Sequence, residues 1–142
     1  MGLDNGIVLV SKRKIDLSEF PNVIFDFYRY DADCFEEKRD DGKYRYEVCY
    51  WRKFWPLRNS ILGCIGCVES NDSITELSID DLNEIRNVIC LKLFTLHNDS
   101  SGEYWDQGTV AQHYGVDLSV ISWLMEFLEE NPLAYCYFYD SY

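Results

Sequence analysis

The sequence predicts an α+β fold, in which residues 1–142 form a single globular domain with a small antiparallel or mixed sheet and about three helices packed mainly on one face. Three observations favour it. A length of 142 residues suits one domain of ordinary size. Aromatic residues are unusually abundant, with four Trp, eleven Tyr and eight Phe, so large apolar areas are available for a core. Runs of strand-like segments followed by helical ones are typical of α+β proteins.

Strands are expected where apolar residues alternate or where β-branched and aromatic residues dominate. Four segments meet these criteria: residues 7–10, 23–30, 44–51 and 133–139. The third alternates with period two, which predicts one buried face. The segment 31–42 is highly charged and ends in Asp41-Gly42, so we expect an exposed hairpin loop there.

Helices are expected where apolar residues recur at a spacing of three or four. Three segments show this pattern: residues 55–69, 78–96 and 117–130. Pro56 suits the first helical position, and Ser78 and Asp117 are natural N-caps for the second and third helices. Residues 97–108 are polar and contain glycine, so we expect a long loop there.

No segment predicts export or a membrane span. Only the four apolar residues 7–10 precede the basic cluster 12–14, whereas a secretory signal has its charges before a longer apolar run. No apolar stretch is long enough to cross a bilayer. Six cysteines without an export signal are typical of reduced thiols. We therefore expect a soluble, cytoplasmic protein that does not bind membranes.

Charge is distributed unevenly along the chain, whose formal net charge is −12. Residues 1–58 contain eleven basic and eleven acidic side chains, whereas residues 59–142 contain only Arg86 and Lys92 against fourteen acids. One face could therefore be acidic enough to bind a basic partner protein, although acidic surfaces more often only maintain solubility. The overall charge would repel phosphates, so we expect no direct nucleic-acid binding.

The segment from Trp51 to Arg58 combines three cations with three large rings at a predicted strand-to-helix junction. Guanidinium groups over aromatic faces, beside a helix N-terminus, suit a phosphate, a carboxylate or a nucleotide base. The more usual alternative is that the rings belong to the core and the cations pair with carboxylates. The candidate ligand-binding residues are Trp51, Arg52, Trp55, Arg58 and His97.

Motifs for catalysis or metal binding are few. His97 lies in a polar segment where it could hold a cation or act in acid–base chemistry, and His113 is expected at the surface or partly packed. Cys64 and Cys67 have motif spacing, but they lie toward the C-terminal end of a predicted helix, where the dipole opposes thiolate formation. The sequence contains no phosphate loop, nucleophile elbow or His-Glu-x-x-His motif. We therefore predict no catalytic residue, no metal site and no cofactor.

Three stretches carry a resemblance: the start MGLDNGI, the central VCYWRK followed by Leu57-Arg58-Asn59, and the end YFYDSY. Through them the chain resembles a group of small bacterial and phage proteins, over most of its length. The resemblance implies a bacterial or mobile-element origin. It implies no activity and no functional residues.

These observations lead to three hypotheses of function. The first is a small acidic accessory protein of bacterial or phage origin that binds a partner protein through its second part. The second is a ligand-binding or enzymatic domain with a pocket around Trp51, Arg52, Trp55 and Arg58, with His97 or His113 nearby. The third is a structural subunit that self-associates through exposed aromatic residues. An acidic face would support the first hypothesis. A concave pocket of converging polar groups would support the second, and a symmetric apolar patch would support the third.

Overall fold

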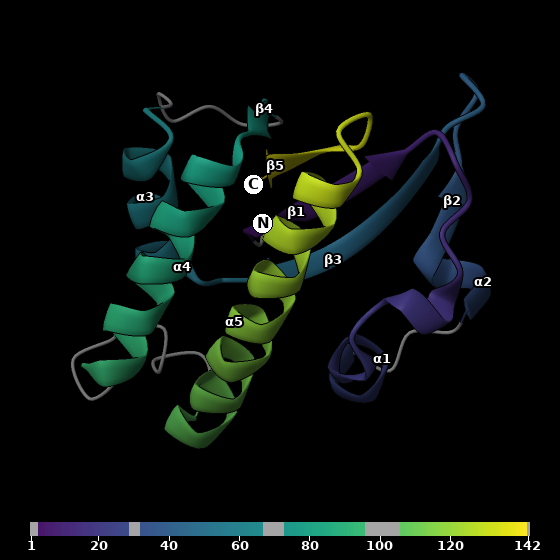
Figure 1. Ribbon diagram of the computed structural model, residues 1–142. Helices are drawn as coiled ribbons and strands as arrows, with labels where there is room; N and C mark the ends of the chain where they lie inside the picture. The colour runs from purple at the N-terminus through teal and green to yellow at the C-terminus, as the bar shows by residue number, and fades with distance from the viewer. Residues whose placement is uncertain (1–2, 29–31, 67–72, 96–105, 142) are drawn as a thin grey trace.

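The computed structural model describes residues 3–28, 32–66, 73–95 and 106–141 (Figure 1). Its strands are β1 (Asp4–Ser11), β2 (Glu36–Lys38), β3 (Tyr44–Arg52), β4 (Ser73–Leu77) and β5 (Tyr135–Ser141). Its helices are the 3-10 helix η1 (Leu17–Glu19) and the α-helices α1 (Asn22–Tyr28), α2 (Ala32–Phe35), α3 (Trp55–Cys64), α4 (Ile79–Phe94) and α5 (Gln107–Glu130).

The strands form one antiparallel sheet of five, in the order β2-β3-β1-β5-β4. The first and last strands are neighbours, with Asp4 opposite Ser141, so the two ends of the described chain lie side by side (Figure 1). The central strand β1 is buried on both faces. Ile7 and Leu9 belong to the main core, whereas Val8 and Val10 alternate with them and are fully buried on the opposite face.

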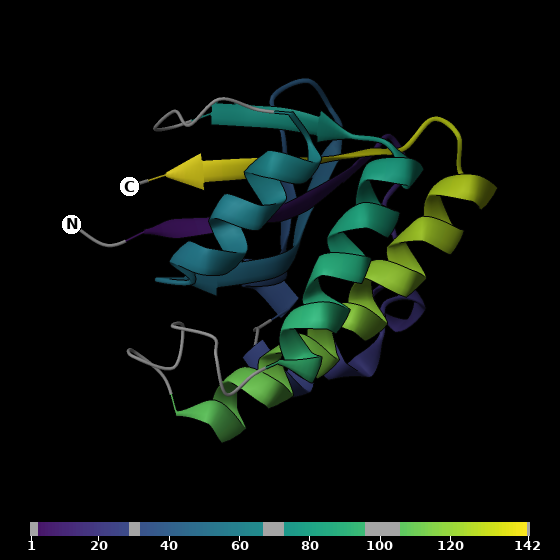
Figure 2. The ribbon, with the colours of Figure 1, turned by 90° about the vertical axis from the view of Figure 1, so that its left-hand side faces the viewer.

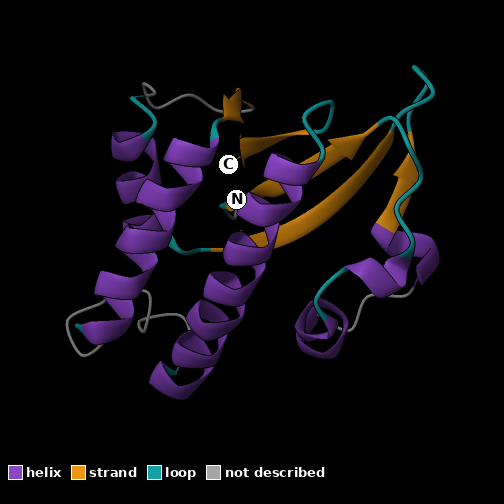
Figure 3. Cartoon of the chain, in the orientation of Figure 1, coloured by secondary structure: helices purple, strands orange, loops and turns teal. Residues whose placement is uncertain are grey.

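Helices α3, α4 and α5 lie together on one side of the sheet (Figure 2). The cartoon in Figure 3 shows the shorter helices α1 and α2 beside the end of the sheet that contains β2. The main core joins buried residues of β1, β3 and β5 to those of the three long helices. The prediction of an α+β fold with helices mainly on one face is therefore confirmed, with a fully antiparallel sheet. None of the described helices has the length and apolar composition that crossing a membrane requires.

Several predicted elements are confirmed. Strands occur at residues 7–10, 44–51 and, from residue 135, at the C-terminal end. The helix predicted after Ser78 begins with a full capping box: the Ser78 hydroxyl accepts the N–H of Asp81 at 3.0 Å, and the Asp81 carboxylate accepts the N–H of Ser78 at 2.9 Å. These two bonds explain why the start of α4 can be read from local sequence.

The strand predicted over residues 23–30 is wrong, because residues 22–28 form helix α1. Its composition favours a strand, but Ile24, Phe27 and Tyr28 also fit a spacing of three and four. Packing against α5 and the core then decides between the two, as tertiary context often does for short apolar segments.

The prediction that Asp117 caps the third helix is also wrong. Asp106 is the N-cap of α5 and its carboxylate accepts the N–H of Thr109 at 2.9 Å, so the helix begins about ten residues earlier in the chain, within the expected loop. Gly108 and Gly115 weaken the helical pattern of the first turns, which hides them from sequence reading. The remainder of the expected loop, residues 97–105, lies outside the described residues.

Two other boundaries differ from expectation. Helix α3 ends at Cys64, and Gly66 follows with a φ of +64°, so the helix is shorter than predicted. The edge strand β4 is an element that the sequence analysis does not predict. The expected hairpin loop of residues 31–42 contains α2 and β2, and only residues 39–43 form the turn, in which Gly42 has a φ of +85°.

Candidate functional site

A cleft of about 340 Å³ lies where α1, the end of β3 and the first turns of α5 meet, and we name it the α1–β3–α5 cleft. Its described lining is Phe27, Tyr28, Tyr50, Arg52, Phe54, Thr109 and His113. Most of this lining is aromatic, and its basic groups are Arg52 and His113.

The cleft exists because β2 is short. This strand pairs only with residues 44–46 of β3. Beyond them, side chains of α1 and α5 lie against the same edge of β3. The N–H of Tyr50 donates to the Tyr28 hydroxyl at 3.2 Å, and Nε2 of His113 lies 2.9 Å from the Tyr50 carbonyl oxygen. These bonds satisfy backbone groups that would otherwise form an exposed edge, and they hold α1 and α5 against β3.

A buried carboxylate supports the cleft from behind. Asp117 is fully buried, one turn after His113 on the same face of α5, and its Oδ2 lies 2.9 Å from Nδ1 of His113. The indole N–H of Trp51 donates to the same oxygen at 2.7 Å. The Tyr28 hydroxyl lies 3.4 Å from Oδ1. Asp117 thus connects α5 to β3 and α1.

The surroundings of His113 favour its charged form. One ring nitrogen faces a carboxylate oxygen and the other a peptide carbonyl oxygen, so both nitrogens must carry a proton to form these two hydrogen bonds. Burial opposes the charge, but the adjacent Asp117 carboxylate outweighs this effect and raises the pKa of His113. With both N–H groups engaged, the imidazolium is suited to positioning and electrostatics rather than to proton transfer.

The structure separates the residues predicted to form a site. Trp51 and Arg52 are consecutive in a strand and point to opposite faces. Trp51 is buried in the core and bonds Asp117, whereas Arg52 is exposed and lines the α1–β3–α5 cleft. His97 lies outside the described residues.

Arg58 is placed in a different part of the molecule. It is 1% exposed and forms a bidentate ion pair with Asp140 of β5, with Nε–Oδ1 and Nη2–Oδ2 distances of 3.0 and 2.7 Å. Its guanidinium carbon also lies 5.4 Å from the centroid of the Trp55 ring. Asp140 therefore neutralises Arg58, and the pair connects α3 to the C-terminal strand.

Sequence reasoning missed most of the cleft. The sequence predicts a strand at Phe27 and Tyr28 and a helix cap at Asp117. The available signal was the spacing of four between His113 and Asp117, which places both side chains on one face of any helix that contains them. That signal can be used only if α5 is known to begin before His113. Gly108 and Gly115 conceal this early start because they weaken the helical pattern.

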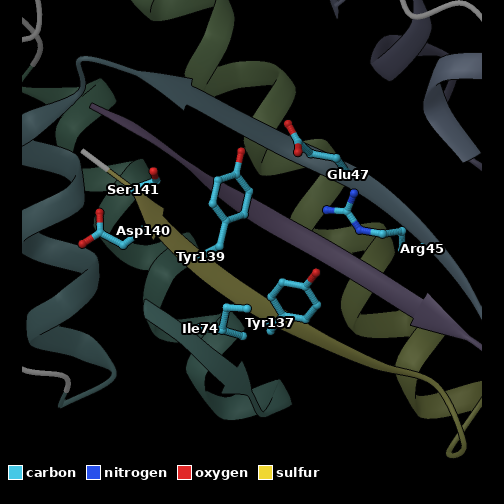
Figure 4. Close-up of a pocket in the computed structure, with 7 residues that line it drawn as sticks. All are labelled: Arg45, Glu47, Ile74, Tyr137, Tyr139, Asp140 and Ser141. Atoms are coloured by element: carbon cyan, nitrogen blue, oxygen red, sulfur yellow. The ribbon is translucent and has the colours of Figure 1, made fainter. Parts of the chain in front are cut away.

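A second hollow, of about 450 Å³, lies on the sheet face opposite the long helices, and we name it the outer hollow (Figure 4). Its described lining is Arg45, Glu47, Ile74, Tyr137, Tyr139, Asp140 and Ser141. Figure 4 shows the side chains of Tyr137 and Tyr139 on the same face of β5, with Arg45 and Glu47 on β3 across the central strand. This hollow mixes both signs of charge.

Cysteine and metal chemistry receive no support from the described residues. Of the predicted cysteine pair, Cys64 is half-buried and Cys67 lies outside the described residues. Cys49 and Cys136 are buried in the core, where burial raises the pKa of Cys136 to about 12 and makes it a small apolar side chain. Within the described part of the chain, no group of three or more His, Cys, Asp or Glu residues could hold a metal ion.

No protein-family model matches the chain, and neither a curated protein nor a solved structure is significantly similar to it.

Proposed function

We propose that the protein binds a small ring-containing ligand in the α1–β3–α5 cleft. The observation that carries this proposal is the convergence of four aromatic side chains from three segments on one cleft: Phe27, Tyr28, Tyr50 and Phe54. Small-molecule sites are typically clefts of about 300–1,000 Å³ with mostly apolar walls and a few polar groups. The cleft's volume of about 340 Å³ and its lining fit that description.

The walls of the cleft are held in place before a ligand arrives. His113 is bonded at both nitrogens, and the Tyr28 hydroxyl is bonded to the backbone of Tyr50. Side chains whose rotamers are already held lose little entropy on binding, which favours affinity. This supports a binding role for the cleft.

The test is a screen of neutral bicyclic compounds, such as indole and 2-naphthamide, by ligand-observed and protein-observed NMR. We expect amide shift changes at Arg52, Thr109 and His113 of the wild-type protein. Thr109→Trp would fill the cleft and abolish binding, whereas Ser119→Trp, an exposed position on the same helix, would leave it intact. Shift changes elsewhere, or none with any ring compound, would exclude the cleft as the site.

A specific feature of α5 favours a second candidate, a basic partner protein. Glu126, Glu129 and Glu130 are exposed near the C-terminal end of this helix, and its last turn contains no basic side chain. Negative charge at a helix C-terminus opposes the macrodipole and destabilises the helix. These carboxylates therefore do not stabilise α5. Their position is consistent with a role in attracting a cationic partner.

This second candidate is tested by passing the tagged protein through a bacterial lysate at low and then raised salt and identifying stoichiometric partners by mass spectrometry. The test variant is Glu126→Gln/Glu129→Gln/Glu130→Gln. The control, with the same change of charge in the first part of the chain, is Glu37→Gln/Asp40→Asn/Asp41→Asn. Loss of a basic, salt-released partner in the first variant alone would support the candidate. Equal loss in both variants would make the effect one of net charge.

A further inference from the structure

The charged residues in the described lining of the α1–β3–α5 cleft are basic, although the protein as a whole is acidic. The chain has 25 acidic residues and a net charge of −12, yet no described lining residue of the cleft is Asp or Glu. The outer hollow contains Glu47. Two further hollows, beside the C-terminal end of α5, both contain Glu130. Of the four hollows, the cleft is therefore the one without a carboxylate in its described lining.

One of the positive charges is built into the wall. The two acceptors beside His113 favour an imidazolium, and three rings surround it, with centroid distances of 4.9 Å to Phe27, 5.0 Å to Phe54 and 5.7 Å to Tyr28. His113 belongs to the described lining of the cleft, whereas Asp117 does not. The cleft is therefore lined by the basic partner of this pair.

The second positive charge is at the rim. Arg52 is exposed and belongs to the cleft lining. Burial and the hydrogen bond to Asp4 raise the pKa of Tyr50 to about 12, while the Arg52 charge acts in the opposite direction. Two carboxylates lie next to the lining and keep their charge: Asp4, which is opposite Arg52 in the β1–β3 pairing, accepts from the Tyr50 hydroxyl at 2.6 Å, and Asp106 accepts from the Thr109 hydroxyl at 2.7 Å.

We propose that the ligand of the cleft is a planar aromatic anion, with its ring among Phe27, Tyr28 and Phe54 and its carboxylate at Arg52. This inference rests on the proposed function and specifies the class of ligand. A guanidinium provides paired N–H donors that match a carboxylate, and the rings provide flat apolar contact. The neighbouring imidazolium adds a second favourable charge, whereas a cationic ligand would face two like charges.

The experiment compares three nearly isosteric probes that differ in charge: 2-naphthoate, 2-naphthamide and 2-naphthamidine. Affinities are measured by NMR titration with the full chain. We expect naphthoate to bind about tenfold more tightly than the amide, the amidine to bind least, and raised salt to weaken naphthoate alone. Arg52→Gln should bring naphthoate to the level of the amide. Arg45→Gln, on the same strand but in the outer hollow, should leave the preference intact.

The outcomes separate the two proposals. Equal affinity of the acid and the amide in the cleft, or a preference for the amidine, would overturn the anionic class while the cleft remained a ligand site. Absence of binding by all three probes would overturn both. Should Arg52→Gln fail to fold, the salt dependence of naphthoate binding to the wild type still decides, because an affinity insensitive to salt contradicts recognition by charge.

Discussion

Two buried carboxylates, Asp117 and Asp140, each hold a basic side chain at close range: His113 within α5, and Arg58 of α3 against β5. In both cases the bonded groups connect a helix to the sheet. Removing one partner of such a pair leaves a buried charge without compensation, which is far more destabilising than the loss of an exposed pair.

The Arg58–Asp140 pair should be a large contributor to stability. Asp140→Asn keeps the shape of the side chain but leaves the Arg58 charge buried and uncompensated, so we expect a loss of about 3–5 kcal/mol in the free energy of unfolding. Glu19→Gln is the control, because it breaks the Arg13–Glu19 ion pair, whose side chains are 48% and 41% exposed. That change should cost less than about 1 kcal/mol. Urea denaturation measures both, and equal effects would refute the prediction.

The charge of His113 should make stability depend on pH. Its pKa is raised in the folded state, so its contribution is fully present below the unfolded value of about 6.5 and is lost as the pH rises through the folded pKa. We expect the difference in unfolding free energy between the wild type and His113→Gln to decrease from about pH 6 to pH 9. Taking this difference cancels the titration of His97, which both proteins contain. A difference that grows with pH would contradict a charged His113.

At the scale of elements, β1 depends on the absence of a side chain at one position. A Cβ on Gly6 would collide with the backbone carbonyl oxygen of Cys49 and approach the Tyr139 ring to 2.9 Å. The neighbouring strand cannot move away without loss of the β1–β3 hydrogen bonds. The requirement for glycine at position 6 therefore comes from the pairing of β1 with β3.

Gly6→Ala should accordingly destabilise the protein by about 1–3 kcal/mol, because overpacking displaces the paired backbone. Gly115→Ala is the matched control, since its Cβ would have no neighbour within 4 Å and it lies inside α5. There the helix propensity of alanine should raise stability by about 0.5–1 kcal/mol. Thermal unfolding of the two variants should give shifts of opposite sign. A loss of stability in both would show that the cause is not the close approach at Gly6.

The helix α1 illustrates how an element can be misread. Its residues favour strands by type, whereas the start of α4 is marked by a capping box. Tyr28 bonds the backbone of Tyr50 and the carboxylate of Asp117, partners 22 and 89 residues away in the chain. Such contacts are invisible to a reading of neighbouring residues, so local propensity gave the wrong element.

At the scale of the whole molecule, the sheet is completed by the last strand of the chain. β5 lies between β1 and β4, and its pairing with β1 joins residues that are more than a hundred positions apart. Contacts of such long range slow folding, because closing the loop is entropically unfavourable. Without β5, the strand β4 has no partner in the described sheet and the core loses Cys136 and Phe138.

Removal of residues 135–142 should therefore abolish cooperative folding. We expect the truncated chain to lose its near-ultraviolet circular dichroism and its sharp urea transition, because the remaining strands cannot bury their inner face. Asp140→Asn in the full-length chain is the control, since it removes the ion pair but retains β5. A truncated chain with a sharp transition of nearly unchanged slope would show that β5 is an accessory strand.

The sequence by itself determined the α+β class, the positions of β1, β3 and β5, and the start of α4, because alternation and capping are local properties. It also identified Trp51, Arg52 and Arg58 as residues of interest, while the cytoplasmic location and the bacterial or phage origin stay predictions. Only the tertiary structure decided what those residues do. Trp51 binds Asp117, 66 positions away, and Arg58 binds Asp140, 82 positions away. The chemistry of a side chain is readable from the sequence, but its partner depends on how distant segments pack, which no local pattern records.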